Sequence, residues 1–414
     1  MSEWKMYKLG KLITLNYGKS LIAEKRIKGN IPVYSSAGFS GWHNASLVES
    51  NGIIVGRKGN VGSVFYSKDP FFCIDTAYYI LPDKNYDLKF IYYKLLSMNL
   101  IRLTSDSAVP GLNRETAYAQ EITIPSLPTQ TQIAQILTSF DDKIELLGQM
   151  NQTLETMAQT IFKEWFVDFN FPGFDGEMVD GLPKGWRKGK LGELTDIKTG
   201  KGLKRSEFKF EGEYPVIGAN GELGRTDRYL LDDKFILTGR VGTLGSINIS
   251  YGKKWYSDNV LIMKPYNSFY YTYFILKLVD MQSLNRGSTQ PLITQTDMKN
   301  YISLIPSQNI LNLFESRIFN LFEGIFSNDE QIRTLTHLRD TLLPKLMGGA
   351  VRLEGYSSVF SGDDLDTVAI SDKLSNESTQ STENLRDTLL PNELSYNEST
   401  PSPENCAIRY CRMS

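Results

Sequence analysis

The stretch IAQILTSFDDKIELLGQMNQTLETMAQTIFKEW, residues 133–165, decides how this chain folds. Its apolar positions alternate spacings of four and three residues from Ile133 to Trp165. The same alternation returns 181 residues later in FESRIFNLFEGIFSNDEQIRTLTHLRDTLLPKL, residues 314–346. Such a heptad seam is typical of helices that pack against each other. The two segments are therefore predicted to pair as long antiparallel helices, with packing of each on its own lobe as the alternative.

Each seam carries one asparagine near its centre, Asn151 in the first and Asn328 in the second. Antiparallel pairing places these two residues opposite each other, Ile133 near Leu346, and Trp165 near Phe314. A buried pair of asparagines lowers stability but fixes the register and orientation of the helices. Asn151 and Asn328 are therefore predicted to set the register of the pair.

The segments that precede the two predicted helices also resemble each other. KLGKLITLNYGKSL from Lys8 returns as KLGELTDIKTGKGL from Lys190, and VGRKGNVGS from Val55 returns as TGRVGTLGS from Thr238. Order and spacing match over about 130 residues, which indicates two homologous halves. Within each half, short apolar runs separated by Gly, Asn and Asp turns predict a β-rich lobe with a few helices.

The predicted fold class is α+β: two homologous β-rich α/β domains joined by two long antiparallel helices in a coiled coil, with pseudo-two-fold symmetry. The predicted boundaries are 1–126 for the first lobe, 127–170 for its helix, 171–185 for a linker, 186–307 for the second lobe, 308–350 for its helix, and 351–414 for an acidic tail. The tail is predicted to be disordered because it offers little apolar surface to bury.

Composition narrows the function classes. No apolar run approaches the roughly 20 residues of a membrane span, and the first residues lack the apolar core of a signal peptide, so a cytoplasmic protein is expected. Three cysteines are too few for a disulfide framework. Two histidines leave little scope for metal ligation or general-base catalysis. The composition favours a binding protein over a hydrolase.

The net charge is −2, but basic and acidic residues are unevenly distributed along the chain. Residues 1–126 contain 15 Lys and Arg against 10 Asp and Glu, and residues 186–307 contain 18 against 12. The intervening residues 127–185 contain 3 against 9, and the tail 5 against 11. This modest basic excess also fits an ordinary solvated surface. Two similar basic lobes on a helical spacer favour a ligand with two separated acidic sites, such as duplex DNA.

The chain resembles the DNA-specificity subunit of type I restriction-modification enzymes over roughly residues 4–353. The most specific segments are IFKEWFVDFNFPGFDG from Ile161, LPKGWRKGKLGEL from Leu182 and LRDTLLPKLMGGAVRL from Leu338. The resemblance implies two target-recognition domains, each reading half of a split DNA site, with the helices as a spacer. It also implies a subunit without catalysis or a cofactor of its own. Two modification subunits would bind S-adenosylmethionine, and two restriction subunits would use ATP and Mg²⁺.

Equivalent glycine-rich loops, residues 56–62 and 239–245, are the first candidates for DNA contact, because glycines let the backbone approach a phosphate or a groove. A tight hairpin that merely exposes its arginine is the alternative. The loops from Tyr17 and Thr199 are second candidates, more as phosphate clamps than as base readers. The full set of candidate DNA-binding residues is Lys19, Ser20, Ser35, Ser36, Arg57, Lys58, Asn60, Asn113, Arg114, Lys201, Lys204, Arg205, Asn220, Arg240, Thr243, Thr289 and Gln290. Because the lobes differ at many of these positions, an asymmetric site is expected.

Catalytic motifs are not recognised in the sequence. Gly18, Lys19 and Ser20 spell the end of a phosphate-binding loop, but Ile13 stands where its first glycine is required. Asp83 and Asp87 superficially resemble a nuclease carboxylate pair, although a turn after a strand explains them better. No catalytic residue and no metal ligand is therefore predicted. Two other functions stay open: a standalone tandem ligand-binding protein with a coiled-coil stalk, and a nuclease without a recognisable motif.

Overall fold

The computed structural model describes residues 4–103, 111–241, 244–287 and 291–350. The predicted tail and the candidates Thr243, Thr289 and Gln290 lie outside the described residues. The chain divides into two compact units, Met1–Leu147 with Glu330–Ser414, and Gly148–Asp329. Each unit contains one lobe and parts of both long helices, because the division falls inside the helices.

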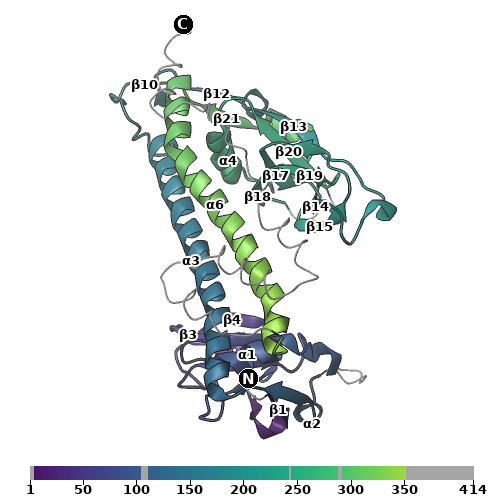
Figure 1. The fold of residues 1–414 in the computed structure, drawn as a ribbon. Helices are drawn as coiled ribbons and strands as arrows, with labels where there is room; N and C mark the ends of the chain where they lie inside the picture. The colour runs from purple at the N-terminus through teal and green to yellow at the C-terminus, as the bar shows by residue number, and fades with distance from the viewer. Residues whose placement is uncertain (1–3, 104–110, 242–243, 288–290, 351–414) are drawn as a thin grey trace, which may run out of the picture. The chain divides into compact units, whose positions relative to one another are not determined.

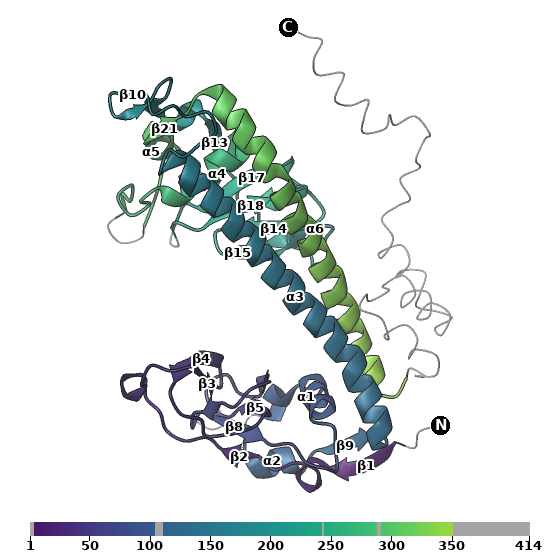
Figure 2. The same cartoon turned by 90° about the vertical axis from the view of Figure 1, so that its left-hand side faces the viewer.

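Lobe 1 contains two small sheets, in the strand orders β2-β8-β5-β6 and β4-β3-β7, and a β1-β9 ribbon (Figure 2). All pairs are antiparallel except β3 with β7. The strands are β1 Lys5–Lys8, β2 Asn16–Tyr17, β3 Ile31–Ser35, β4 Gly38–His43, β5 Gly52–Gly56, β6 Val64–Ser67, β7 Phe72–Cys73, β8 Ala77–Ile80 and β9 Glu121–Ile124. The helices are α1 Leu88–Ser97 and α2 Arg114–Tyr118, with 3-10 turns η1 Leu9–Lys11, η2 Ala23–Lys25 and η3 Leu100–Leu103.

Lobe 2 repeats this arrangement, in the orders β13-β20-β17-β18, β15-β14-β19-β16 and β12-β21, with β16 as an additional strand. The strands are β12 Arg187–Lys190, β13 Thr195–Thr199, β14 Tyr214–Gly218, β15 Gly221–Thr226, β16 Leu231–Asp232, β17 Phe235–Gly239, β18 Ile247–Ser250, β19 Lys253–Tyr256, β20 Val260–Pro265 and β21 Ile302–Ile305. The helices are α4 Phe269–Leu278 and α5 Gln295–Asn300, with η4 Leu191–Glu193 and η5 Arg205–Glu207. The hairpin β10 Met178–Val179 with β11 Leu182–Pro183 precedes it.

Two 40-residue helices, α3 Leu127–Phe166 and α6 Gln308–Met347, run antiparallel and side by side (Figures 1 and 2). The sequence favours long helices because glycine and proline are scarce in both. Pro128 stands in the first turn of α3, where its missing N–H costs no helical hydrogen bond. Beyond the end of α3, Phe169 adopts the left-handed conformation, with φ of 59°. The predicted fold class, two related β-rich lobes with a long helix pair, is confirmed.

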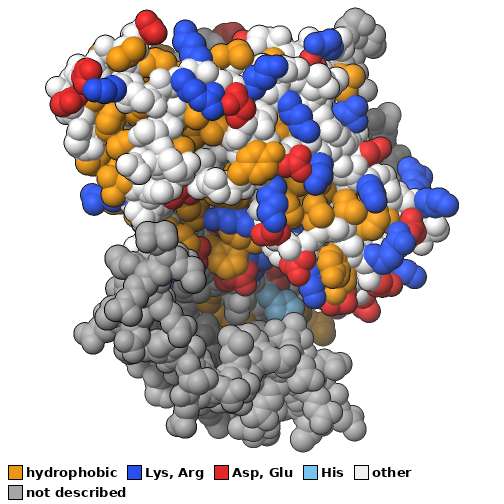
Figure 3. All heavy atoms as spheres, turned by 90° about the horizontal axis from the view of Figure 1, so that it is seen from above, with side chains coloured by type: hydrophobic (Ala, Val, Ile, Leu, Met, Phe, Trp, Pro, Cys, Tyr) orange, Lys and Arg blue, Asp and Glu red, His pale blue; other side chains and the backbone are white. Residues whose placement is uncertain are grey.

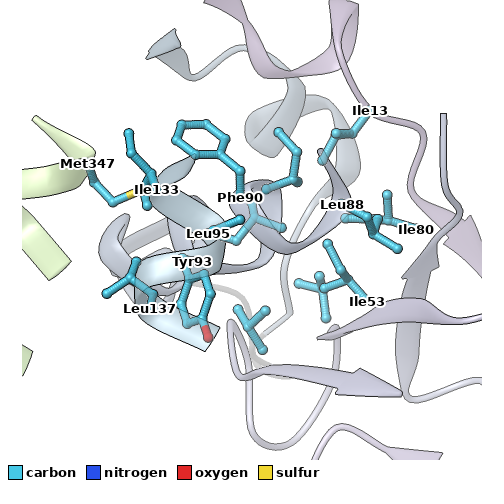
Figure 4. Packing of buried hydrophobic residues seen from close by; sticks show 14 of the residues in the cluster. Ile13, Ile53, Ile80, Leu88, Phe90, Tyr93, Leu95, Ile133, Leu137 and Met347 are labelled. Carbon is cyan, nitrogen blue, oxygen red and sulfur yellow. The ribbon is translucent and has the colours of Figure 1, made fainter. Parts of the chain in front are cut away.

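The seam residues are buried in two ways at once. In the first unit, Ile133 and Leu137 of α3 pack with Phe90 and Tyr93 of α1 (Figure 4). The same cluster contains residues of α6, including Leu346. Helix pairing and packing on the lobe, which the sequence posed as alternatives, therefore both occur. The apolar face of α3 is wide enough to contact both α6 and the lobe, because the buried Ala134 and Ile136 extend it beyond the heptad positions.

Aromatic side chains fill the corresponding core of the second unit. The rings of Trp165 and Phe314 lie 5.9 Å apart, as antiparallel pairing predicted. Phe166 lies 5.6 Å from Trp186, and Phe171 stacks on Trp186 at 5.1 Å, all as distances between ring centroids. The aromatic segment from Ile161 thus joins the end of α3 to the beginning of lobe 2. Among the described residues, no helix is long and apolar enough to cross a membrane.

The predicted asparagine pair is present. Asn328 donates a hydrogen bond from Nδ2 to Oδ1 of Asn151 at 2.8 Å, and Asn151 donates to Asp329 at 2.7 Å. Arg339, the charged residue on the second seam, donates to Asp141 at 2.7 Å, and the Tyr93 hydroxyl donates to the same carboxylate at 2.6 Å. These three polar residues on the seams therefore each have a hydrogen-bond partner on the other long helix.

Candidate nucleic-acid interface

Three loops of lobe 1 that the sequence selected meet along residues 73–76, at the end of β7 and in the turn to β8. The backbone N–H groups of Arg57 and Lys58 donate to the carbonyl of Thr76 at 2.9 and 3.0 Å. Ser36 N–H donates to the Thr76 hydroxyl at 3.2 Å. The loop from Tyr17 joins them through Lys19 N–H, which donates to the carbonyl of Cys73 at 3.0 Å. The strand ends thus gather these loops into one surface.

Arg57 is half-buried rather than freely exposed. Its Nη1 donates to the carbonyl of Asp75 at 3.1 Å, and its guanidinium carbon lies 4.9 Å from the ring centroid of Tyr17. Arg114 approaches the same ring at 5.3 Å. Burial, with the hydrogen bond to Tyr17 as a further cause, raises the pKa of Tyr78 to about 12, so this neighbouring ring stays neutral at pH 7. Two guanidinium groups are therefore held beside one tyrosine ring.

The loop after β5 is a compact turn that exposes Lys58 and Asn60. Gly59 and Gly62 have φ of 75° and 77°, a conformation that side chains other than glycine rarely adopt. A Cβ on Gly56 would lie 2.1 Å from the Asn60 carbonyl oxygen. The turn in lobe 1 therefore itself requires these glycines.

Asn113 and Arg114 reach this surface from α2. Leu112 N–H donates to the Arg57 carbonyl at 2.9 Å, which fixes the start of the helix beside the loop. Asn113 Oδ1 accepts from the backbone of Glu115 and Thr116 at 2.8 and 3.2 Å. Asn113 is therefore the N-cap of α2, whereas Arg114 faces Tyr17.

Lobe 2 builds the same surface from different residues. Arg240 N–H donates to the carbonyl of Asn259, the counterpart of Thr76, at 2.8 Å. Lys201 N–H donates to the Tyr256 carbonyl at 2.8 Å, and Ile293 N–H donates to the Arg240 carbonyl at 3.0 Å. Thr199 stands where lobe 1 has Tyr17. Arg240 therefore has no equivalent of the tyrosine ring on which Arg57 stacks.

The sequence prediction missed Thr294 and Gln295. Thr294 Oγ1 accepts from Asp297 N–H at 3.2 Å and caps α5, as Asn113 caps α2. Gln295 thus corresponds to Arg114, and its amide lies 2.5 Å from the Thr199 hydroxyl. Strands β9 and β21 are offset by 181 residues, and adding this offset to Asn113 and Arg114 would have found the pair. The sequence placed its candidates at Thr289 and Gln290 instead, outside the described residues.

The remaining candidates lie in turns or at the end of a strand beside one. Lys204 and Arg205 lie at the start of η5, and Asn220 lies in the turn between β14 and β15. Ser35 Oγ accepts from Ala37 N–H at 3.1 Å in the corresponding turn of lobe 1, and Ser20 is exposed after Lys19. Among the hydrogen bonds of the described residues, none joins Lys204, Arg205 or Asn220 to the Arg240 loop. A further cation that the sequence prediction missed is Arg228, whose guanidinium carbon lies 5.1 Å from the Trp255 ring centroid.

Charge on the outer surface is mixed. On the face shown in Figure 3, Lys and Arg side chains are interspersed with acidic and hydrophobic ones. Within the described ranges, no group of His, Cys, Asp and Glu side chains is arranged to hold a metal ion.

Comparison with known proteins identifies a family. The model of the type I restriction modification DNA specificity domain matches residues 1–156 and 183–323. The MjaIX specificity subunit of Methanocaldococcus jannaschii is 29% identical over 73% of this chain and 78% of its own. The HindI specificity subunit of Haemophilus influenzae is 25% identical over 71% of this chain and 85% of its own. The crystal structure of the type I restriction-modification S subunit from M. genitalium shares the fold, with a TM-score of 0.58, 22% identity, and coverage of 83% of this chain and 96% of that one.

Proposed function

The chain belongs to the type I restriction modification DNA specificity family, and we propose that each lobe reads one half of a bipartite, asymmetric DNA site. Its relatives are named specificity subunits, and it serves as the DNA-recognition component rather than a catalytic one. The family model matches twice, once over each lobe, as expected if recognition is divided between them.

One observation carries this proposal. Loops in equivalent positions gather at Thr76 in lobe 1 and at Asn259 in lobe 2, but they present different side chains. Lobe 1 offers Arg114 where lobe 2 offers Gln295. Arginine pairs best with guanine, and glutamine pairs best with adenine, through two hydrogen bonds in the major groove. Equivalent surfaces with different chemistry should read different half-sites.

We further propose that α3 and α6 set the distance between the half-sites and bind two methyltransferase subunits. Met150 and Met157 of α3 and Phe319 of α6 are 45%, 48% and 50% exposed, which leaves apolar surface for a partner on the helix pair of the second unit. Two restriction subunits would complete the enzyme. S-adenosylmethionine, ATP and Mg²⁺ would bind to these partners and not to this chain, and the complex would act in the cytoplasm, where the DNA lies.

Methylation-aware sequencing of host DNA, with and without the gene, tests the proposal. A methylated motif that depends on the gene should consist of two unequal halves separated by a fixed number of unspecified bases. Deletion of the methyltransferase gene should remove the same motif, since the modification belongs to the complex. A continuous palindromic motif, or unchanged methylation after deletion of the gene for this chain, would contradict the proposal.

A further inference from the structure

Lobe 1 exposes two aromatic side chains on one strand. Phe39 and Trp42 of β4 are 53% and 54% exposed, and their ring centroids lie 5.1 Å apart. The pairing of β3 with β4 shifts between Pro32 and Tyr34, and Gly41 has φ of 124°. Such an irregularity re-aims side chains, so that residues three positions apart both face solvent. Exposed large aromatic residues that cluster in this way indicate a binding surface.

This aromatic pair adjoins the candidate interface. Phe39 follows the turn at Ser36, whose backbone N–H binds the Thr76 hydroxyl at 3.2 Å. Arg26 donates to the carbonyl and the hydroxyl of Ser40, between the two aromatic positions. The exposed Lys25 and Lys28 flank Arg26 in the sequence. Exposed aromatic rings beside several cations suit the bases and phosphates of a nucleic acid better than an uncharged ligand.

Lobe 2 differs at the corresponding positions. Strand register places Glu222 where lobe 1 has Phe39, and Arg225 where it has Trp42. The guanidinium of Arg225 binds the backbone of its own lobe: Nε donates to the Gly212 carbonyl at 2.6 Å, and Nη2 donates to the Glu213 carbonyl at 2.7 Å. The aromatic pair is therefore a property of lobe 1 and is not required by the shared fold.

We propose that Phe39 and Trp42 contact the bases of the half-site read by lobe 1, and so provide an apolar element of recognition that lobe 2 does not use. This inference rests on the proposed function. DNA is favoured over a protein partner because the pair continues the surface formed around Thr76 and is flanked by cations.

The fluorescence of Trp42 tests the contact directly. The chain contains five tryptophans, of which Trp165, Trp186 and Trp255 are buried and Trp4 is half-buried. The difference between the fluorescence of the unaltered chain and that of Trp42→Phe therefore reports the exposed indole of Trp42. A duplex carrying the methylated motif should reduce quenching of this indole by acrylamide. A duplex in which only the lobe 1 half-site is scrambled should not.

Affinity for the same duplex provides a second measurement. Phe39→Ala and Trp42→Ala should each weaken binding about tenfold, as expected for loss of an aromatic contact with a base, whereas Trp42→Phe should retain most of the affinity. Tyr7→Ala, which removes a 38% exposed ring from β1, is the matched control and should bind as the unaltered chain does.

Unchanged affinity of both alanine variants, together with an indole that stays accessible to acrylamide on the duplex, would overturn the inference and leave the proposed function intact. Protection of Trp42 by the methyltransferase subunit in the absence of DNA would assign the pair to a protein interface, and would overturn it too. Failure of the unaltered chain, in complex with that subunit, to bind the motif would instead overturn the proposed function.

Discussion

Arg57 and Arg240 occupy equivalent backbone positions but have different surroundings. The guanidinium of Arg57 is held by the Asp75 carbonyl and the Tyr17 ring. Among the described residues, Nε of Arg240 is buried without a hydrogen-bond partner. An arginine held in place loses less conformational entropy on binding, so if both arginines contact DNA as proposed, we expect Arg57 to be the better organised of the two before DNA binds.

If each arginine reads a base, as we propose, Arg57→Ala and Arg240→Ala should each cost about 1 to 3 kcal/mol of binding free energy. The loss should be confined to the half-site of the altered lobe, so each variant is the control for the other. Competition binding with duplexes altered in one half-site at a time measures this. If a variant bound every DNA sequence more weakly by the same factor, the arginine would contact a phosphate and not a base.

The lobes also differ in how they cap an equivalent helix. Asp87 caps α1 by accepting from Phe90 N–H at 2.9 Å. Ser268, its counterpart before α4, makes no such bond. Instead, Glu315 of α6 accepts from the N–H groups of Tyr270 and Tyr271 at 3.1 and 2.9 Å. Burial raises the pKa of Glu315, while the two N–H groups oppose that shift.

Glu315→Ala should therefore lower the free energy of unfolding by about 1 to 3 kcal/mol, because it leaves buried N–H groups without an acceptor. Adding Ser268→Asp to this variant should restore part of the loss, since the new carboxylate would stand where Asp87 stands in lobe 1. Thermal unfolding of the single and double variants measures both effects. A double variant no more stable than Glu315→Ala would argue against the cap.

At the scale of elements, the apolar seams of α3 and α6 pack both against each other and against the lobes. Its outer turns pack on the lobes, whereas its middle carries the Asn151–Asn328 hydrogen bond. An asparagine pair in an apolar seam favours one alignment over all shifted ones, because any shift would take the buried amide of Asn328 away from Asn151. The pair is thus suited to fixing a length as well as holding two helices together.

Removal of one heptad from each helix, symmetrically about Asn151 and Asn328, should change the DNA spacer. Seven residues at about 1.5 Å each shorten a helix by about 10 Å, which is about three base pairs at roughly 3.4 Å each. We expect preference for a spacer about three base pairs shorter, or loss of specific binding because the half-sites also rotate around the duplex. Binding assays with a series of spacer lengths measure this. Unchanged affinity for the original site would show that the helices do not set the spacing.

At the scale of the whole molecule, the internal repeat makes the structure modular. Each lobe has its own sheets and its own set of loops, and the core of each unit is built from its own lobe and helix segments. The lobes should therefore be exchangeable without refolding their partners.

Replacement of residues 1–126 by the homologous lobe of another family member should alter one half of the methylated motif and leave the other half and the spacer unchanged. The reciprocal replacement of residues 186–307 serves as the control and should alter the opposite half. Methylation-aware sequencing of hosts that express each hybrid gives the result. If a single exchange altered both halves, recognition would not be divided between the lobes.

The sequence alone was sufficient to predict the repeat, the helix pair and the opposed asparagines. All three depend on periodic patterns along the chain, and a heptad seam limits its partner to a matching seam. It also identified the loops around Arg57 and Arg240, because glycines at fixed positions mark the turns in both lobes.

Only the tertiary structure decided how these loops combine. Thr76, which binds two of them, and Cys73, which binds the third, lie in no motif, and Tyr17 stacks on arginines 40 and 97 residues away in the sequence. The pairing of Glu315 with α4 and the exposure of Phe39 and Trp42 are likewise invisible in the sequence. Contacts of this kind depend on sheet register and on packing between distant segments, and no local periodicity specifies either.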